Sequence, residues 1–159
     1  MQIDFYLLKN DLEQATMMFA CQILEKAYSL DHKVFVCTKD KEDAFFLDEL
    51  LWTYKPSSFI PHNIQGEGPE PPPSIQIGYL QEPRGFNDIL INLTDTIPIF
   101  HKKFTRIIEI IENKDASKES GRIRFREYKK YNYQLVTHDI DNKQSPCSRR
   151  HVAQSLPLS

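Results

Sequence analysis

The residues best suited to chemistry form a basic stripe between Lys114 and Tyr133. Four cations and one aromatic residue recur there at helical spacing: Lys118, Arg122, Phe125, Arg126 and Lys129. At about 100° per residue they fall within an arc of about 100° on one helix face. Arginine can hold a carboxylate through two parallel hydrogen bonds, and a ring between cations can contact a bulky apolar side chain. The pattern favours a peptide that ends in acidic and hydrophobic residues.

Two other interpretations of the stripe stay open. A run of charges can be no more than a solvated helix face. Single-stranded nucleic acid is a rival ligand, because base stacking and phosphate neutralisation use the same residue types. The segment from Lys114 to Tyr133 has seven basic and three acidic residues, so it carries +4 in a chain whose total is −2. One aromatic residue and a net acidic chain favour the peptide over nucleic acid.

A second group of residues lies on a helix predicted to begin at Asp40 and to break at Pro56. Its core-facing stripe is formed by Ala44, Leu47, Leu50, Leu51 and Tyr54. Phe45 and Trp52, seven residues apart, share the opposite side of the helix. Aromatic rings in that position indicate that another segment of the chain, or another protein, covers them.

Nucleotide-binding and catalytic patterns are weak in this sequence. The turn at residues 9–13, KNDLE, has no glycine to bring backbone close to a pyrophosphate, and the sequence has no P-loop motif. The five histidines lack metal-ligand spacing, and His62 is expected to fix its loop through a backbone hydrogen bond. We therefore predict no catalytic residue, cofactor or metal. A small α/β nucleotide-binding protein or enzyme is the alternative class.

The elements that position these residues alternate between strand and helix. Strands are predicted at 3–8, 33–37, 75–79, 89–93 and 106–111, with an edge strand at 134–138. Helices are predicted after Asn10 or Asp11, from Asp40, near Thr96 and over 114–133. This alternation predicts a single α/β domain, residues 1–140, with a mainly parallel sheet flanked by helices. Strand 75–79 is expected to be half-exposed, and residues 141–159 are expected to form a disordered tail.

Composition indicates a globular protein of a reducing compartment. The chain has 159 residues, 40% hydrophobic and 26% charged, with no apolar run of the roughly 20 residues that a membrane span needs. The first residues, MQIDFYLLKND, lack the features of a signal peptide. Cys21 and Cys37 lie in apolar runs and are expected to be buried thiols. We expect a cytoplasmic protein.

Several motifs, in this order, resemble the chi subunit of bacterial DNA polymerase III, an accessory protein of the clamp loader. They are FYLL near the start, LDELLW (47–52), SFIPHNIQGEGP (58–69), DILINL (88–93) and RIRFREYKKY (122–131). The resemblance spans about residues 2–140, and SFIPHNIQGEGP is its most specific part. It implies a nucleotide-binding-like topology without a nucleotide site, and a non-enzymatic replisome adaptor.

The resemblance also implies two partner surfaces. One binds the psi subunit and includes Trp52 and Phe59, to which we add Phe45 and Pro61; a helicase of the XPD/DinG type is a further candidate partner there. The other is a pocket for the acidic C-terminal tail of single-stranded DNA-binding protein. It is implied to consist of Lys118, Arg122, Phe125, Arg126 and Lys129, with Ile111 as an apolar wall.

Two positions of the implied pocket depart from the family pattern. Phe125 stands where the family has a tyrosine, and Lys129 stands where arginine is familiar. The first change keeps the ring and loses a hydroxyl, and the second keeps the charge and loses the planar fork. Both are expected to soften affinity without abolishing it.

Overall fold

Strands and helices alternate along the chain except between residues 53 and 101, where three strands follow one another. The computed structural model describes residues 1–55, 59–68, 70–79 and 81–140. The strands are β1 (Gln2–Leu8), β2 (Val34–Cys37), β3 (His62–Ile64), β4 (Ile75–Gly78), β5 (Ile89–Asn92), β6 (Arg106–Ile111) and β7 (Gln134–Ile140). The helices are α1 (Ala15–Ser29), α2 (Lys41–Thr53) and α3 (Asp115–Lys130), with a 3-10 turn η1 (His101–Lys103). Pro56 and the predicted tail at 141–159 lie outside the described residues.

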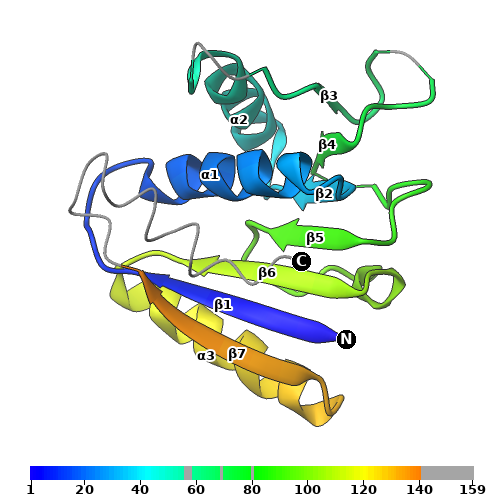
Figure 1. Ribbon diagram of the computed structural model, residues 1–159. Coiled ribbons are helices and arrows are strands. Elements are labelled where there is room, and N and C mark those ends of the chain that lie inside the picture. The colour runs from blue at the N-terminus through cyan, green and yellow to red at the C-terminus, as the bar shows by residue number, and fades with distance from the viewer. Residues whose placement is uncertain (56–58, 69, 80, 141–159) are drawn as a thin grey trace.

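The strands form one 7-stranded sheet in the order β3-β4-β2-β5-β6-β1-β7. Each neighbouring pair in this order is parallel. The N-terminal strand is enclosed by the two strands that come last in the chain, since Gln2 is in register with both Arg106 and Gln134. Figure 1 shows the sheet with β7 at one side and β3 at the other. The predicted fold class, a single α/β domain with a parallel sheet, is confirmed.

Each face of the sheet carries its own hydrophobic core. Side chains alternate across a strand, so Ile108 and Ile110 of β6 pack with α1 and α2, whereas Ile107 and Ile111 pack with α3 and η1. Burial on both faces explains why the central strands are nearly continuous apolar runs. Because α2 and α3 cover opposite faces, the aromatic residues of α2 and the cations of α3 are far from each other (Figure 1).

One local prediction was wrong and one strand was missed, because tertiary contacts outweigh local pattern. Strand 75–79 was expected to be half-exposed, but all of β4 is buried, including Gln76 at 7% exposure. It pairs with β2 on one edge and with β3 on the other. Strand β3 was itself missed, since it follows Pro61 in a short segment with no alternation that extends beyond three residues.

The start of the first helix also differs from its prediction. Asn10 and Asp11 were expected to cap it, but α1 begins at Ala15, after Gln14 with φ 68°, and has no side-chain cap. Asn10 instead accepts a hydrogen bond from the Leu12 amide at 3.0 Å, which closes a turn before the helix. The next helix was expected to begin at Asp40, and Asp40 is its N-cap, because its carboxylate accepts a hydrogen bond from the Asp43 amide at 2.8 Å.

Candidate functional site

The basic stripe of α3 borders a pocket of about 330 Å³ between that helix and the sheet. This volume is within the range of about 300–1,000 Å³ that ligand sites occupy. Helix α3 contributes Lys118, Gly121, Arg122, Phe125 and Arg126 to the lining. The sheet contributes Phe5, Leu7 and Leu8 from β1, Ile111 from β6, Glu112 just after β6, and Thr137 from β7. The structure thus brings five of the six residues expected at the tail site into one pocket. The sixth, Lys129, is exposed one helical turn further along α3 and does not line it.

The interior of the pocket is apolar. Phe5 and Phe125 contact each other with ring centroids 5.3 Å apart, and Ile111 is 4% exposed. Gly121 lets α3 approach the sheet closely, because a Cβ built there would lie 2.8 Å from Ile111 Cδ1. The resulting floor suits a bulky hydrophobic side chain.

Cations surround the opening of the pocket. Arg122 Nη1 lies 3.2 Å from Glu119 Oε2, but both side chains are more than 60% exposed, so water screens the pair. Lys118 and Arg126 form no ion pair with any residue in the described part of the chain. Exposed cations without strong internal partners are available to the carboxylates of a ligand.

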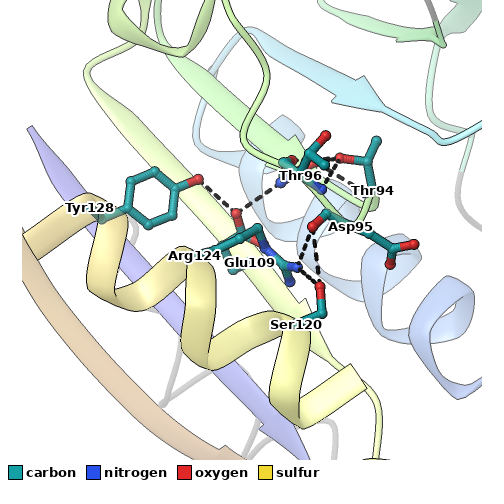
Figure 2. A network of polar contacts seen from close by, with 8 residues as sticks. Thr94, Asp95, Thr96, Glu109, Ser120, Arg124 and Tyr128 are labelled. Atoms are coloured by element: carbon teal, nitrogen blue, oxygen red, sulfur yellow. Dashed lines mark hydrogen bonds and ion pairs between the residues drawn. The ribbon is translucent and has the colours of Figure 1, made fainter. Parts of the chain in front are cut away.

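A buried polar network holds α3 against the sheet (Figure 2). Arg124 Nε donates to Glu109 Oε1 at 3.0 Å, and the Tyr128 hydroxyl and Asn92 amide donate to Glu109 Oε2 at 2.7 and 2.9 Å. Arg124 also donates to the Asp95 carbonyl oxygen at 3.0 Å. Burial raises the pKa of Glu109, while the charge of Arg124 and the hydrogen bonds lower it.

This network sets the orientation of the cationic stripe. Arg124 is two residues from both Arg122 and Arg126, so its guanidinium group lies on the opposite side of α3 from theirs. Anchoring Arg124 inward leaves the other two at the surface. This role of Arg124 was not predicted from the sequence, although one signal was present: Glu109 interrupts the otherwise apolar interior of the RIIEII strand.

The aromatic surface on α2 is exposed as the helical wheel predicts. Trp52 is 55% exposed and Phe59 is 65% exposed, with ring centroids 5.5 Å apart. Beneath them His62 is 4.7 Å from the Trp52 ring, and its Nδ1 lies 2.7 Å from the Ile60 carbonyl oxygen. The predicted backbone hydrogen bond of His62 is therefore confirmed. Pro61 is half-buried and directly precedes His62 in the chain. We refer to Trp52, Phe59 and Pro61 together as the aromatic patch.

Phe45 lies near but not within this patch. It precedes Trp52 by two helical turns, about 11 Å along the axis, and is 38% exposed. Lys41 Nζ is 5.6 Å from its ring centroid. Phe45 is therefore a separate exposed ring nearer the start of α2, with a cation beside it.

Among the described residues, no cluster of three or more histidine, cysteine, aspartate or glutamate side chains could hold a metal ion. Across that same part of the chain, no helix has both the length and the apolar character of a membrane span.

The fold and these surfaces define a small parallel α/β protein with a cationic pocket at one end of its sheet and an aromatic patch at the other. Solved structures share the topology. Phage T4 UvsW superposes with a TM-score of 0.61 at 10% identity, over 88% of this chain and 41% of that one. Domain 2 of the DEAD-box helicase Mss116p gives a TM-score of 0.56 at 10% identity, over 99% of this chain and 70% of that one. At such identity the likeness concerns the fold alone, and it confirms the nucleotide-binding-like topology.

The chain belongs to the DNA polymerase III chi subunit family, whose pattern it matches over residues 1–136. DNA polymerase III subunit chi of Pseudomonas aeruginosa is 31% identical over 139 residues, 87% of this chain and 96% of the relative. The subunits chi of Haemophilus influenzae and Escherichia coli are each 31% identical over 138 residues. These matches cover 86% and 84% of this chain and 95% and 94% of the respective relatives. The resemblance seen in the sequence motifs is confirmed.

Proposed function

We propose that the protein is a non-catalytic adaptor of the replisome in the cytoplasm. Its pocket binds the acidic C-terminal tail of single-stranded DNA-binding protein, and its aromatic patch binds the psi subunit that connects it to the clamp loader. The observation that carries the proposal is the convergence of Lys118, Arg122 and Arg126 on an apolar pocket closed by Phe125 and Ile111.

The chemistry of the pocket matches such a tail. An apolar terminal side chain would lie on the floor, its carboxylate would meet the cations at the opening, and preceding acids would follow the stripe. A few charge-assisted hydrogen bonds and one buried aromatic contact predict micromolar binding, about −8 kcal/mol. Because the cations are exposed, the affinity should fall as salt shortens the screening length from about 8 Å.

A titration tests the pocket. A labelled peptide with acidic residues and a C-terminal phenylalanine is added to wild type, to Arg122→Glu and to Lys130→Glu. Arg122→Glu should weaken binding at least about tenfold, because it reverses a charge at the opening. Lys130→Glu is the matched control, since Lys130 is an exposed cation of α3 that does not line the pocket. Equal affinities for the three proteins would refute the site, and a preference for a bare oligonucleotide over the peptide would favour direct binding of single-stranded DNA.

A co-purification experiment tests the aromatic patch. Trp52→Ala should lose most of its retention of psi, because a large exposed ring at an interface is a typical binding hot spot. Phe46→Ala is the matched control, an aromatic residue of α2 that is 39% exposed on a different side of the helix. Full retention of psi by Trp52→Ala would contradict this part of the proposal. The same pair of variants tests whether an XPD/DinG-type helicase uses the patch.

A further inference from the structure

Strand β7 presents a long free edge beside the pocket. Among the described strands it is the last of the sheet and pairs with β1 alone, with seven residues, Gln134–Ile140 (Figure 1). Edge strands commonly carry proline, lysine or a bulge that prevents further pairing. The β7 sequence QLVTHDI has neither proline nor lysine. The opposite edge strand, β3, has only three residues.

The direction of the β7 backbone groups follows from two hydrogen bonds at its ends. The Gln134 amide donates to the Met1 carbonyl oxygen at 3.2 Å, and the Lys9 amide donates to the Ile140 carbonyl oxygen at 3.1 Å. Alternate residues of a strand direct their backbone groups to opposite edges. The backbone N–H and C=O groups of the even-numbered residues therefore face β1, and those of Leu135, Thr137 and Asp139 face outward. No described strand lies beyond β7 to pair with them.

Thr137 connects this edge to the pocket. Its side chain lines the pocket wall while its backbone N–H and C=O face outward. It is in register with Phe5, and the Phe5 ring contacts Phe125 at 5.3 Å, so Thr137 and Phe125 lie at the same level of the sheet. A peptide bound beside Phe125 is therefore next to the free edge.

The cations of α3 define the direction in which such a peptide would run. Helix α3 precedes β7 and is antiparallel to it, so Lys129 lies one turn beyond Phe125 toward the start of β7, near the level of Leu135. Lys118 and Arg122 lie toward the other end, near Ile111 and Leu8. Arg122 can hold a terminal carboxylate through two parallel hydrogen bonds, which the ammonium group of Lys129 cannot form. With the carboxylate at Arg122 and the preceding acids near Lys129, the peptide would run parallel to β7.

We propose that the acidic peptide held by the pocket continues as an eighth parallel strand on the outer edge of β7, hydrogen-bonded to the backbone of Leu135 and Thr137. This inference rests on the proposed function of the pocket. It gives Lys129 a role, although Lys129 does not line the pocket. Pairing ends before Asp139, because the carboxylate of Asp139, which lies 3.8 Å from Lys9 Nζ, would repel the acidic ligand.

Two matched substitutions at one position test the strand. Thr137→Pro removes the outward N–H, and an edge strand tolerates proline where its N–H faces solvent. Thr137→Val keeps that N–H and nearly the same side-chain shape. We expect Thr137→Pro to bind the labelled peptide about three- to tenfold more weakly than Thr137→Val, the loss of one backbone hydrogen bond. Circular dichroism establishes that both variants are folded.

N-methylation of the peptide provides a second readout on wild-type protein, which decides the matter even if Thr137→Pro fails to fold. Methyl groups placed on successive backbone nitrogens should weaken binding at every second position, because only alternate N–H groups of a strand face its neighbour. A flat profile overturns the added strand, whatever the affinity of Thr137→Pro. If Arg122→Glu still abolishes binding in that case, the pocket itself stands. If wild type binds no peptide, both proposals fail.

Self-association is the competing use of this edge. Sedimentation of wild type and Thr137→Pro measures it. A wild-type dimer that Thr137→Pro abolishes, with peptide affinity unchanged, would assign the edge to a second copy of this chain and overturn the proposal.

Discussion

Replacement of Arg124 by methionine tests the buried network that orients α3. The side chains of Arg124 and Glu109 are 6% and 0% exposed, and their charged atoms are 3.0 Å apart. Removing the guanidinium leaves the Glu109 carboxylate buried, with only Asn92 and Tyr128 as donors. Loss of one partner of a buried ion pair costs about 3–5 kcal/mol, a large share of the roughly 5–15 kcal/mol that stabilises a domain. The Tm should fall by roughly 6–20 °C for a chain of this size.

The loss should depend on pH. Burial raises the pKa of Glu109, and removing the opposing charge of Arg124 raises it further. A carboxyl group whose pKa is higher in the folded than in the unfolded protein destabilises the fold at pH values above its folded pKa. Acidification protonates it and relieves that cost. The stability deficit of Arg124→Met should therefore shrink between about pH 8 and about pH 5.5.

Urea unfolding followed by circular dichroism at both pH values measures these effects. Arg122→Met is the matched control: its side chain is 62% exposed, and its loss should cost less than about 1 kcal/mol. Glu109→Gln/Arg124→Met removes both charges and should recover much of the lost stability. The reasoning is refuted if Arg124→Met and Arg122→Met unfold at the same urea concentration, or if the deficit does not change with pH.

Three further predictions follow from single sites. In Gly121→Ala the new Cβ lies 2.8 Å from Ile111 Cδ1 and displaces it into the pocket, so peptide affinity should fall several-fold. Alanine has a helix propensity about 1 kcal/mol better than glycine, which offsets the crowding and should keep the Tm within a few degrees of wild type. Burial lowers the pKa of His101 from 6.5, so the stability contributed by the neutral His101 side chain is present above that pH and is lost as pH falls. In urea titrations, His101→Gln should therefore lose less stability than wild type between about pH 7.5 and about pH 5. Burial raises the pKa of Cys21 to about 12 and of Cys37 to about 11, so neither thiol should react while the protein is folded. In a Cys147→Ser protein, which keeps only these two cysteines, mass spectrometry should detect no alkylation by iodoacetamide until denaturant is added.

Much of the fold follows from patterns that are local in sequence. The runs that became β2, β5 and β6 are buried on both faces, so they are apolar throughout and are recognised without knowledge of their neighbours. The burial of β4 could not be predicted this way, because it depends on β3 and β2 lying on either side of it. Gln14 shows the same limit at a helix start, where a left-handed backbone replaced the expected side-chain cap.

In the candidate site, too, residues local in sequence could be predicted and residues from distant strands could not. Helical spacing alone placed Lys118, Arg122, Phe125 and Arg126 on one face, and the structure puts them around one pocket. The opposite wall, with Phe5 and Thr137, comes from strands more than a hundred residues apart in the chain and has no sequence signature. Lys129 shares the periodicity yet lies outside the pocket, since the helix continues beyond the cavity.

The position of β1 between β6 and β7 has a consequence during synthesis. Strand β1 has no neighbour in the sheet until residues 106–111 and then 134–140 have been made. Contacts between segments so distant in sequence form slowly. A nascent chain that has not reached residue 134 therefore lacks β7, which contributes Thr137 to the wall of the pocket.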